Sequence, residues 1–182
     1  MQTWVVLLRG INVGGKNRVP MADLREAFAE MGFTEPTTYI QSGNVVVGAP
    51  GKPATTDIGR IEEELSTRFG YEARVVIRDR TQMRRVVREI PADWDPADTS
   101  TRYYVLFPVA GVRARDVLGE VTPKPAFESV AAGAHAVYWS APFATITRTA
   151  MAKLTASPLY KQVTIRNLNT TLKLLDLMDA RR

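Results

Sequence analysis

Side chains that could bind a ligand are concentrated in a short glycine-rich loop near the amino terminus. Arg9 to Arg18 reads Arg-Gly-Ile-Asn-Val-Gly-Gly-Lys-Asn-Arg and directly follows the apolar run from Trp4 to Leu8. Glycines let a backbone turn its N–H groups toward a ligand, and this loop carries cations but no acid. The loop is therefore suited to bind an anion, and its candidate ligand-binding residues are Arg9, Asn12, Lys16 and Asn17.

The loop nearly matches the phosphate-binding P-loop. Gly10, Gly15 and Lys16 satisfy G-x-x-x-x-G-K, but Asn17 stands where a P-loop has the Ser or Thr hydroxyl that binds magnesium. Pro20 also marks the first helical turn a few residues later than a P-loop helix begins. Both departures disfavour a P-loop nucleotidase. The alternative that the glycines serve only backbone geometry stays open.

No complete catalytic set accompanies the loop. The chain has no Cys, which excludes disulfides and thiol chemistry, and its single histidine, His135, excludes a site that needs two histidines. Ser42 lies in Gln-Ser-Gly-Asn, which is typical of a turn rather than of an activated nucleophile. No metal site is indicated, and the catalytic residues, the reaction and any cofactor stay unknown.

Charge is distributed unevenly along the chain. The 182 residues have a formal net charge of +5. Ser129 to Leu175 contains no Asp or Glu and by itself contains five cations, and residues 1 to 22 are also free of acids. Such segregation favours an anionic partner, such as a nucleotide, a phosphorylated metabolite or nucleic acid.

Strand and helix patterns follow a recognisable order over the first 80 residues and define where the loop lies. The patterns predict a strand, a helix closed by Gly32, two strands joined by Ser42-Gly43-Asn44, a second helix capped by Thr56 or Asp57, and a last strand. The predicted strands are Trp4 to Arg9, Thr37 to Gln41, Val45 to Gly48 and Tyr71 to Arg78. This β-α-β-β-α-β order is that of a ferredoxin-like unit.

Such a topology makes a geometric prediction. With strands in the order 4-1-3-2 and antiparallel, the glycine-rich loop and the second turn leave the same end of the sheet. We therefore expect the two polar turns to share one rim. The second turn adds Gln41, Ser42 and Asn44 to the candidate ligand-binding residues.

Residues 81 to 182 predict a second α+β unit, related to the first or an incomplete copy of it. Thr81 to Ile90 and Val112 to Leu118 are expected to be helical, Arg102 to Val109 to be a strand, and Phe127 to Ser140 to form a hairpin. Pairwise similarity between the halves is too weak to define a sequence repeat. The predicted fold class is thus α+β, with domains 1–80 and 81–182 that could also form one compact protein.

A last amphipathic helix is expected from about Arg166. At 100° per residue its polar stripe contains Arg166, Asn169, Thr170 and Lys173, opposite Leu168, Leu172 and Leu175. Its amino-terminal N–H groups favour phosphate or carboxylate. The candidate ligand-binding residues here are Arg166, Asn167, Asn169, Thr170 and Lys173. The alternative is an ordinary solvated helix face.

Three segments resemble the hallmark blocks of an uncharacterised bacterial family, domain of unknown function 1697. They are Leu7-Leu8-Arg9-Gly10-Ile11-Asn12-Val13-Gly14-Gly15, Tyr39-Ile40-Gln41-Ser42-Gly43-Asn44-Val45, and Arg166-Asn167-x-Asn169-Thr170-x-x-Lys173-Leu174. The blocks occur in order along nearly the whole chain. The resemblance implies an α+β fold and no established activity.

Three function classes follow. We favour a site for an anionic small molecule, enzymatic or not, built from the glycine-rich loop, the Ser42 turn and the last helix. A nucleic-acid-binding module is the alternative, although the Trp4 and Val45 strands carry few stacking aromatics. A structural or interaction protein is the third class. The apolar run Trp4 to Leu8 is too short for a signal peptide or a membrane span, so we expect a cytoplasmic protein with no membrane partner. Its oligomeric state stays open.

Overall fold

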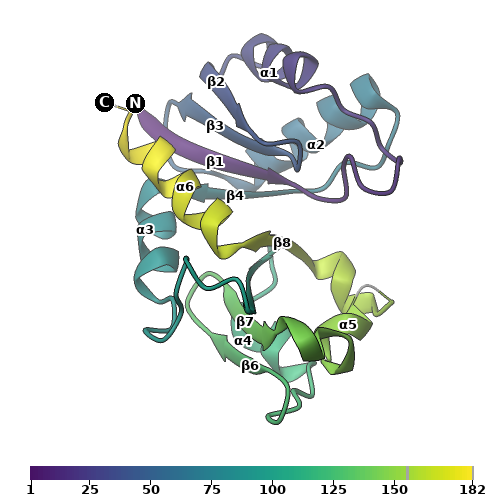
Figure 1. Cartoon of the computed structure of the whole chain (residues 1–182). Coiled ribbons are helices and arrows are strands. Elements are labelled where there is room, and N and C mark those ends of the chain that lie inside the picture. The colour runs from purple at the N-terminus through teal and green to yellow at the C-terminus, as the bar shows by residue number, and fades with distance from the viewer. Residues whose placement is uncertain (155, 182) are drawn as a thin grey trace. The chain divides into compact units, whose positions relative to one another are not determined.

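The computed structural model describes residues 1–154 and 156–181, which form two compact units (Figure 1). Unit 1 contains Met1–Met83 and the chain from Leu174 onward, and unit 2 contains Arg84–Lys173. The sequence assigned all of residues 81–182 to the second half. The last turns of the final helix instead belong to unit 1.

Unit 1 is a four-stranded antiparallel sheet with two helices on one face. Its strands lie in the order β2-β3-β1-β4, so β1 is central and pairs with both β3 and β4. The elements are β1 (Gln2–Leu8), α1 (Met21–Glu30), β2 (Thr34–Tyr39), β3 (Asn44–Ala49), α2 (Thr55–Phe69) and β4 (Val75–Asp79), and α3 (Arg80–Arg88) then leads into unit 2.

The core of unit 1 follows from strand alternation. Trp4, Val6 and Leu8 of β1 point to one face and pack with Leu24 and Phe28 of α1 and with α2. All of these side chains are buried, as expected when a central strand is covered by helices. Glycine at position 70 ends α2 in the left-handed conformation. The predicted cap of α2 was wrong: Ala54 is the N-cap, and the Asp57 side chain accepts the Ala54 N–H.

Unit 2 contains a second four-stranded antiparallel sheet, in the order β6-β7-β5-β8. Its elements are β5 (Thr101–Pro108), α4 (Ala114–Gly119), β6 (Ser129–Ala132), β7 (Val137–Pro142), the 3-10 helix η1 (Phe143–Arg148), α5 (Met151–Leu154), the 3-10 helix η2 (Pro158–Gln162), β8 (Val163–Asn167) and α6 (Leu168–Asp179), whose end lies in unit 1.

The two units repeat one topology. In both, the first strand is central and the fourth strand lies beside it at one edge. The fourth strands share the sequence Val-x-Ile-Arg, at Val75–Asp79 and Val163–Asn167. Arg78 pairs with Val5, and Arg166 pairs with Val105, so the shared motif occupies the same register in both sheets. The second half is therefore related to the first in topology, although most of its residues differ.

The connection before the fourth strand is where the units differ. In unit 1 a single helix, α2, spans Thr55–Phe69, whereas the same connection in unit 2 is broken into η1, α5 and η2. Pro158 begins η2, and a proline cannot continue a helix because it lacks an N–H and its ring clashes with the preceding turn. In this connection, short helical segments therefore take the place of one long helix over the sheet of unit 2.

The last helix begins later than the sequence indicated. Arg166 and Asn167 lie in β8, and α6 starts at Leu168. The Asn167 side-chain oxygen accepts the N–H of Thr170 at 2.7 Å, which makes Asn167 the capping residue. The helical pattern was wrongly extended to Arg166 because the short strand β8 leads directly into the leucine-rich helix, with no loop between them.

Unit 1 holds the end of α6 through Arg80. This side chain lies 3.7 Å from the Asp179 carboxylate and donates at 2.8 Å to the carbonyl of Arg181. Arg181 in turn donates to Thr37 of the edge strand β2 at 2.8 Å. These contacts explain why the last residues group with unit 1.

Candidate functional site

The glycine-rich loop is a miniature hairpin. The Lys16 N–H donates to the Val13 carbonyl at 3.1 Å, and the Asn12 N–H donates to the Asn17 carbonyl at 3.1 Å. Gly14 and Gly15 at its tip have φ values of 58° and 76°. Two consecutive residues with positive φ are the requirement of a tight type I′ turn, which explains the glycine pair. No helix begins at Lys16, since α1 starts at Met21, and this is further evidence against a P-loop.

Asn12 fastens this hairpin to the second polar turn. Its side-chain NH₂ donates to the carbonyls of Val19 and Gln41 at 3.0 and 2.9 Å, and its oxygen accepts the Val19 N–H at 2.9 Å. The Leu8 N–H also donates to the Gly43 carbonyl at 2.8 Å. The prediction that the two turns share a rim is therefore confirmed.

The close approach of the turns needs a glycine at position 43. A Cβ there would lie 2.7 Å from the Leu8 Cβ and 2.8 Å from the Ile11 Cδ1, and the residue has φ +74°. Asn44 follows it, fully buried, and donates to the Tyr39 carbonyl at 3.0 Å and to the Ser42 hydroxyl oxygen at 2.9 Å. Asn44 thus holds the turn rather than presenting its amide to solvent.

The other predicted residues of the rim divide into supporting and exposed ones. Asn17 donates to the Gly10 carbonyl at 2.9 Å, and Arg9, half-buried, donates its backbone N–H to the Arg74 carbonyl at 2.9 Å. Lys16 and Gln41 are exposed. Three asparagines that the sequence offered as ligand-binding residues thus have structural hydrogen bonds, which sequence spacing could not reveal.

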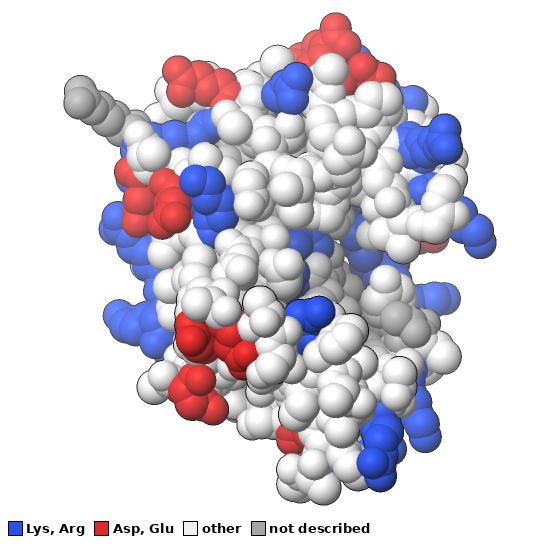
Figure 2. All heavy atoms as spheres, in the orientation of Figure 1, with Lys and Arg blue, Asp and Glu red and all other residues white. Residues whose placement is uncertain are grey.

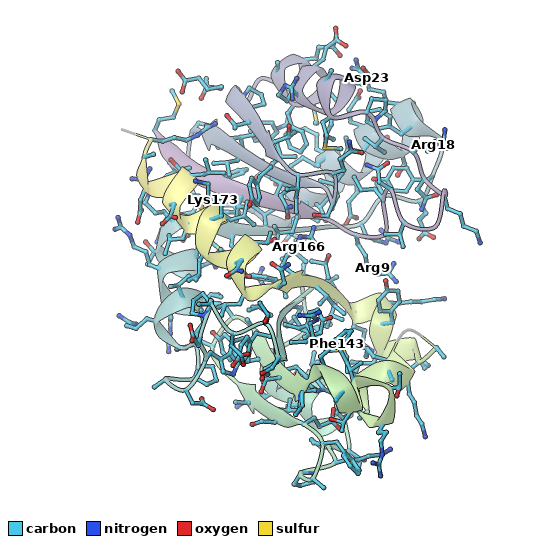
Figure 3. The ribbon with its side chains drawn as sticks, in the orientation of Figure 1. Arg9, Arg18, Asp23, Phe143, Arg166 and Lys173 are labelled. Carbon is cyan, nitrogen blue, oxygen red and sulfur yellow. The ribbon has the colours of Figure 1, made fainter. Side chains whose placement is uncertain are left out.

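A pocket of about 410 Å³ opens on this rim. Its lining residues are Asn12, Gly15, Arg18, Val19, Pro20 and Gln41. Arg18 is exposed at the outer edge of the loop, where blue spheres gather in Figure 2 and where Figure 3 labels it. Within the described chain, no carboxylate forms an ion pair with Arg18 or Lys16. The candidate list from sequence omitted Arg18, although its place in the acid-free first 22 residues was a usable signal.

The carboxy-terminal candidates have a different arrangement from the predicted stripe. Arg166 lies on the strand that leads into α6 (Figure 3), with 7% of its surface exposed. It donates to the Thr164 hydroxyl at 2.9 Å and to the Ile165 carbonyl at 2.7 Å. Burial lowers the pKa of its guanidinium to about 10, because removing the cation from water disfavours the charged form. Arg166 was therefore wrongly placed on an exposed helix face.

The helix itself buries part of the predicted polar stripe. Leu168 and Thr170 are 4% and 5% exposed and Thr171 and Leu174 are fully buried, whereas Leu172 is only half-buried. Asn169 and Lys173 are exposed, and Asn169 donates to the Pro96 carbonyl at 3.3 Å. The stripe was misplaced because the helix packs through Leu168, Thr171 and Leu174 instead of Leu168, Leu172 and Leu175.

Two kinds of feature are absent from the described residues. Residues 1–154 and 156–181 contain no group of three or more His, Cys, Asp or Glu side chains that could hold a metal ion. Over the same residues, every helix is too short or too polar to cross a bilayer.

Comparisons with known proteins give a family and a fold. A family model described as "Protein of unknown function (DUF1697)" matches residues 1–138. The solved structure of a conserved bacterial protein, SP0830 from Streptococcus pneumoniae, is similar with a TM-score of 0.82 and 25% identity, covering 97% of this chain and 98% of that one. An unknown protein from Galdieria sulphuraria has a TM-score of 0.27 and 15% identity, covering 91% of this chain and 96% of that one. The acetolactate synthase small subunit from Thermotoga maritima has a TM-score of 0.21 and 16% identity, covering 92% of each chain. None of the curated proteins matches.

Proposed function

The chain belongs to the DUF1697 family, and we propose that unit 1 binds a small molecule through an anionic group, of phosphate or carboxylate type, in the pocket beside Arg18. The main support for the proposal is the pocket and the presence of Arg18 in its lining. Residues of both the glycine-rich hairpin and the Gln41 turn line it, Arg18 among them, and Lys16 lies on the same loop.

Electrostatics favour an anion at this rim. Lys16 and Arg18 lie in a segment without acids, and neither is neutralised by a carboxylate in the described chain. Cations that are not already paired attract an anion without first breaking an ion pair. A guanidinium also offers a planar set of donors that matches two oxygens of a phosphate or carboxylate.

Preorganisation supports binding at this place. The side-chain bonds of Asn12 and the close packing at Gly43 fix both walls of the pocket before a ligand arrives. A site that is already ordered loses less conformational freedom on binding. The structural asparagines therefore act as positioning residues for Lys16, Arg18 and Gln41.

We further infer that each unit is a variant of the ferredoxin-like arrangement, which the strand orders β2-β3-β1-β4 and β6-β7-β5-β8 support. This arrangement also occurs in nucleic-acid-binding modules, and the acid-free stretch Ser129 to Leu175 favours nucleic acid as the second candidate partner.

The proposal is tested by isothermal titration of inorganic pyrophosphate, ADP, citrate and a single-stranded oligonucleotide into the wild-type protein and two variants. Arg18→Gln removes the cation at the pocket, and Lys52→Gln, an exposed cation of another loop in unit 1, is the matched control. We expect Arg18→Gln to weaken binding of at least one small anion by about 10- to 100-fold, the range of a charge-assisted hydrogen bond. Lys52→Gln should leave the affinity unchanged.

The outcomes separate the two candidate functions. Binding of only the oligonucleotide, with an affinity that falls steeply with salt, would replace the small-anion proposal with the nucleic-acid one. Equal affinities of Arg18→Gln and wild type for the small anions would show that these ligands do not bind in this pocket.

A further inference from the structure

A pocket of about 260 Å³ in unit 2 lies where β8 ends and α6 begins. The strand β5 pairs with β8 only from Tyr104 onward, so the first three residues of β5, Thr101 to Tyr103, extend beyond the end of β8. These three residues line the pocket together with residues 167 to 169. The third of the segments that resemble the family blocks therefore contributes to a pocket that the proposed function does not use.

The corresponding place in unit 1 is occupied by an arginine. By the register of the shared Val-x-Ile-Arg motif, Arg80 of unit 1 corresponds to Leu168 of unit 2. Arg80 donates to the Thr3 hydroxyl at 2.8 Å and lies 3.7 Å from the Asp179 carboxylate. An apolar side chain at this position cannot make such contacts. The place beside the first residues of β5 is therefore left open as a pocket in unit 2.

Two opposite charges, Asp98 and Arg102, line this pocket. In the described part of the chain neither of them forms an ion pair, with the other or with any further residue. The Arg102 guanidinium donates to the Thr99 carbonyl at 3.3 Å and lies 4.4 Å from the centre of the Phe143 ring. A cation and a carboxylate that share a pocket without pairing are complementary to a ligand that carries both charges.

Hydrogen bonds keep the Asp98 carboxylate in place and ionised. The Ser100 hydroxyl and N–H donate to its Oδ1 at 2.6 and 2.7 Å, and the Tyr103 hydroxyl donates to its Oδ2 at 3.2 Å. These bonds, that of the Ser100 hydroxyl above all, hold the pKa of Asp98 well below its usual range. The Tyr103 ring in turn packs on Trp94, with ring centroids 4.8 Å apart. The pocket thus has a fixed negative charge at neutral pH.

The start of α6 adds a polar donor and an apolar surface. The Asn167 side-chain oxygen accepts the Thr170 N–H at 2.7 Å, and the NH₂ group of the same side chain makes no hydrogen bond within the described chain. Leu168 and the half-buried Tyr104 contribute apolar surface to the lining. Charged groups, an amide and apolar surface therefore meet in one small pocket.

We propose that this pocket binds an α-amino acid with an apolar side chain. The carboxylate of the amino acid accepts hydrogen bonds from Arg102 and Asn167, its ammonium group is attracted by Asp98, and its side chain packs on Leu168 and Tyr104. The volume is small for a site that holds a drug-sized molecule, which suits a ligand of this size. The site lies within unit 2 and does not rest on the anion site of unit 1.

Isothermal titration of L-alanine, L-leucine and L-phenylalanine into the full chain at neutral pH tests the proposal. The amino acid that binds most tightly is then compared with its amide, which lacks the negative charge, and with its deamino acid, which lacks the positive charge. For L-leucine these are L-leucinamide and 4-methylpentanoate. Each analogue should bind about tenfold more weakly or worse, because it loses one charge-assisted contact. The proposal is overturned if none of the three amino acids binds, or if either analogue binds as tightly as the amino acid.

Two variants assign the charges of the ligand to the two residues. Arg102→Gln should weaken binding of the amino acid about tenfold and abolish the preference over its amide, and Asp98→Asn should do the same for the deamino acid. Arg88→Gln and Asp93→Asn are the matched controls, because both residues are exposed in unit 2 and lie outside the pocket lining. They should leave every affinity unchanged.

A further variant serves if Asp98→Asn does not fold, as circular dichroism would show. Thr101→Lys places a cation in the pocket lining, so it should weaken binding of the amide and strengthen binding of the deamino acid. Wild-type affinity for the amino acid in folded Arg102→Gln overturns the proposed site. The same result in the folded variant of Asp98 or Thr101 overturns the role of Asp98 and with it the zwitterionic ligand class.

Discussion

The side-chain amide of Asn12 donates a 2.9 Å hydrogen bond to the main-chain carbonyl of Gln41, 29 residues away. This bond joins the glycine-rich hairpin to the turn between β2 and β3 and so defines one wall of the candidate anion pocket. Asn12 also has φ 54°, a conformation that asparagine tolerates better than most residues. One residue therefore supplies both the backbone bend and the connection.

Asn12→Ala should lower the free energy of unfolding by roughly 2 to 4 kcal/mol. The change removes the side-chain hydrogen bonds to Val19 and Gln41 and leaves alanine at a positive φ that these bonds no longer stabilise. Denaturant unfolding measures this loss. Asn12→Gly separates the causes, since glycine accepts the backbone conformation and lacks the amide. Wild-type stability in both variants would show that the Gln41 connection contributes nothing.

Gly43→Ala should destabilise unit 1 by about 2 kcal/mol or more, since the new methyl group would meet Leu8 and Ile11 and the residue has positive φ. Gly59→Ala is the matched control. It lies within α2 with open space around it, so the same change should stabilise by about 0.5 to 1 kcal/mol. Thermal unfolding should thus shift in opposite directions, and a shift in the same direction for both would contradict the close approach at Gly43.

Leu174→Ala should cost about 2 to 5 kcal/mol, the range for a fully buried leucine, and the half-buried Leu172→Ala should cost clearly less. Lys173→Ala, on an exposed position between them, should change stability by at most about 0.5 kcal/mol. Chemical denaturation of the three variants checks the orientation of α6. A larger loss for Leu172→Ala than for Leu174→Ala would restore the face that helical periodicity from Arg166 suggested.

Tyr71 should make stability fall at high pH. Burial raises the pKa of its phenol to about 12, from an ordinary value of 10.0. The folded state therefore holds this proton more tightly than the unfolded state, and its contribution is full below pH 10 and is lost as the pH rises toward 12. The difference in unfolding free energy between wild type and Tyr71→Phe should thus shift in favour of the variant above pH 10.

The measurement compares the two proteins at several pH values between neutral and alkaline. At neutral pH the substitution should have little effect, because the Tyr71 hydroxyl is buried without a hydrogen-bond partner in the described chain. A difference that stays constant with pH would show that Tyr71 titrates normally.

Much of the local structure could be predicted from the residues. Strand alternation in Trp4 to Leu8, helical spacing from Met21 to Met31 and the Ser-Gly-Asn turn act over a few residues, so their signals are present in the sequence itself. The meeting of the two turns also followed, because their ends of the sheet are set by strand direction. Acid-free segments likewise identified the rim that carries Lys16 and Arg18.

Three features depended on contacts between distant residues. Asn12 became a supporting residue because the carbonyl of Gln41, 29 residues away, came within reach of its amide. Val163 to Asn167 form the strand β8 because they pair with β5, and no local sequence pattern predicts this pairing.

The same dependence applies to α6. Helical periodicity gives the angles between residues but does not decide which face of the helix packs, and Thr170, Thr171 and Leu174 are buried by neighbours that folding supplies. Short-range sterics and composition are local properties, so most elements of unit 1 and the charge of the rim could be predicted from the residues. Which polar side chains remain exposed could not, since burial and hydrogen bonding depend on neighbours brought together by folding.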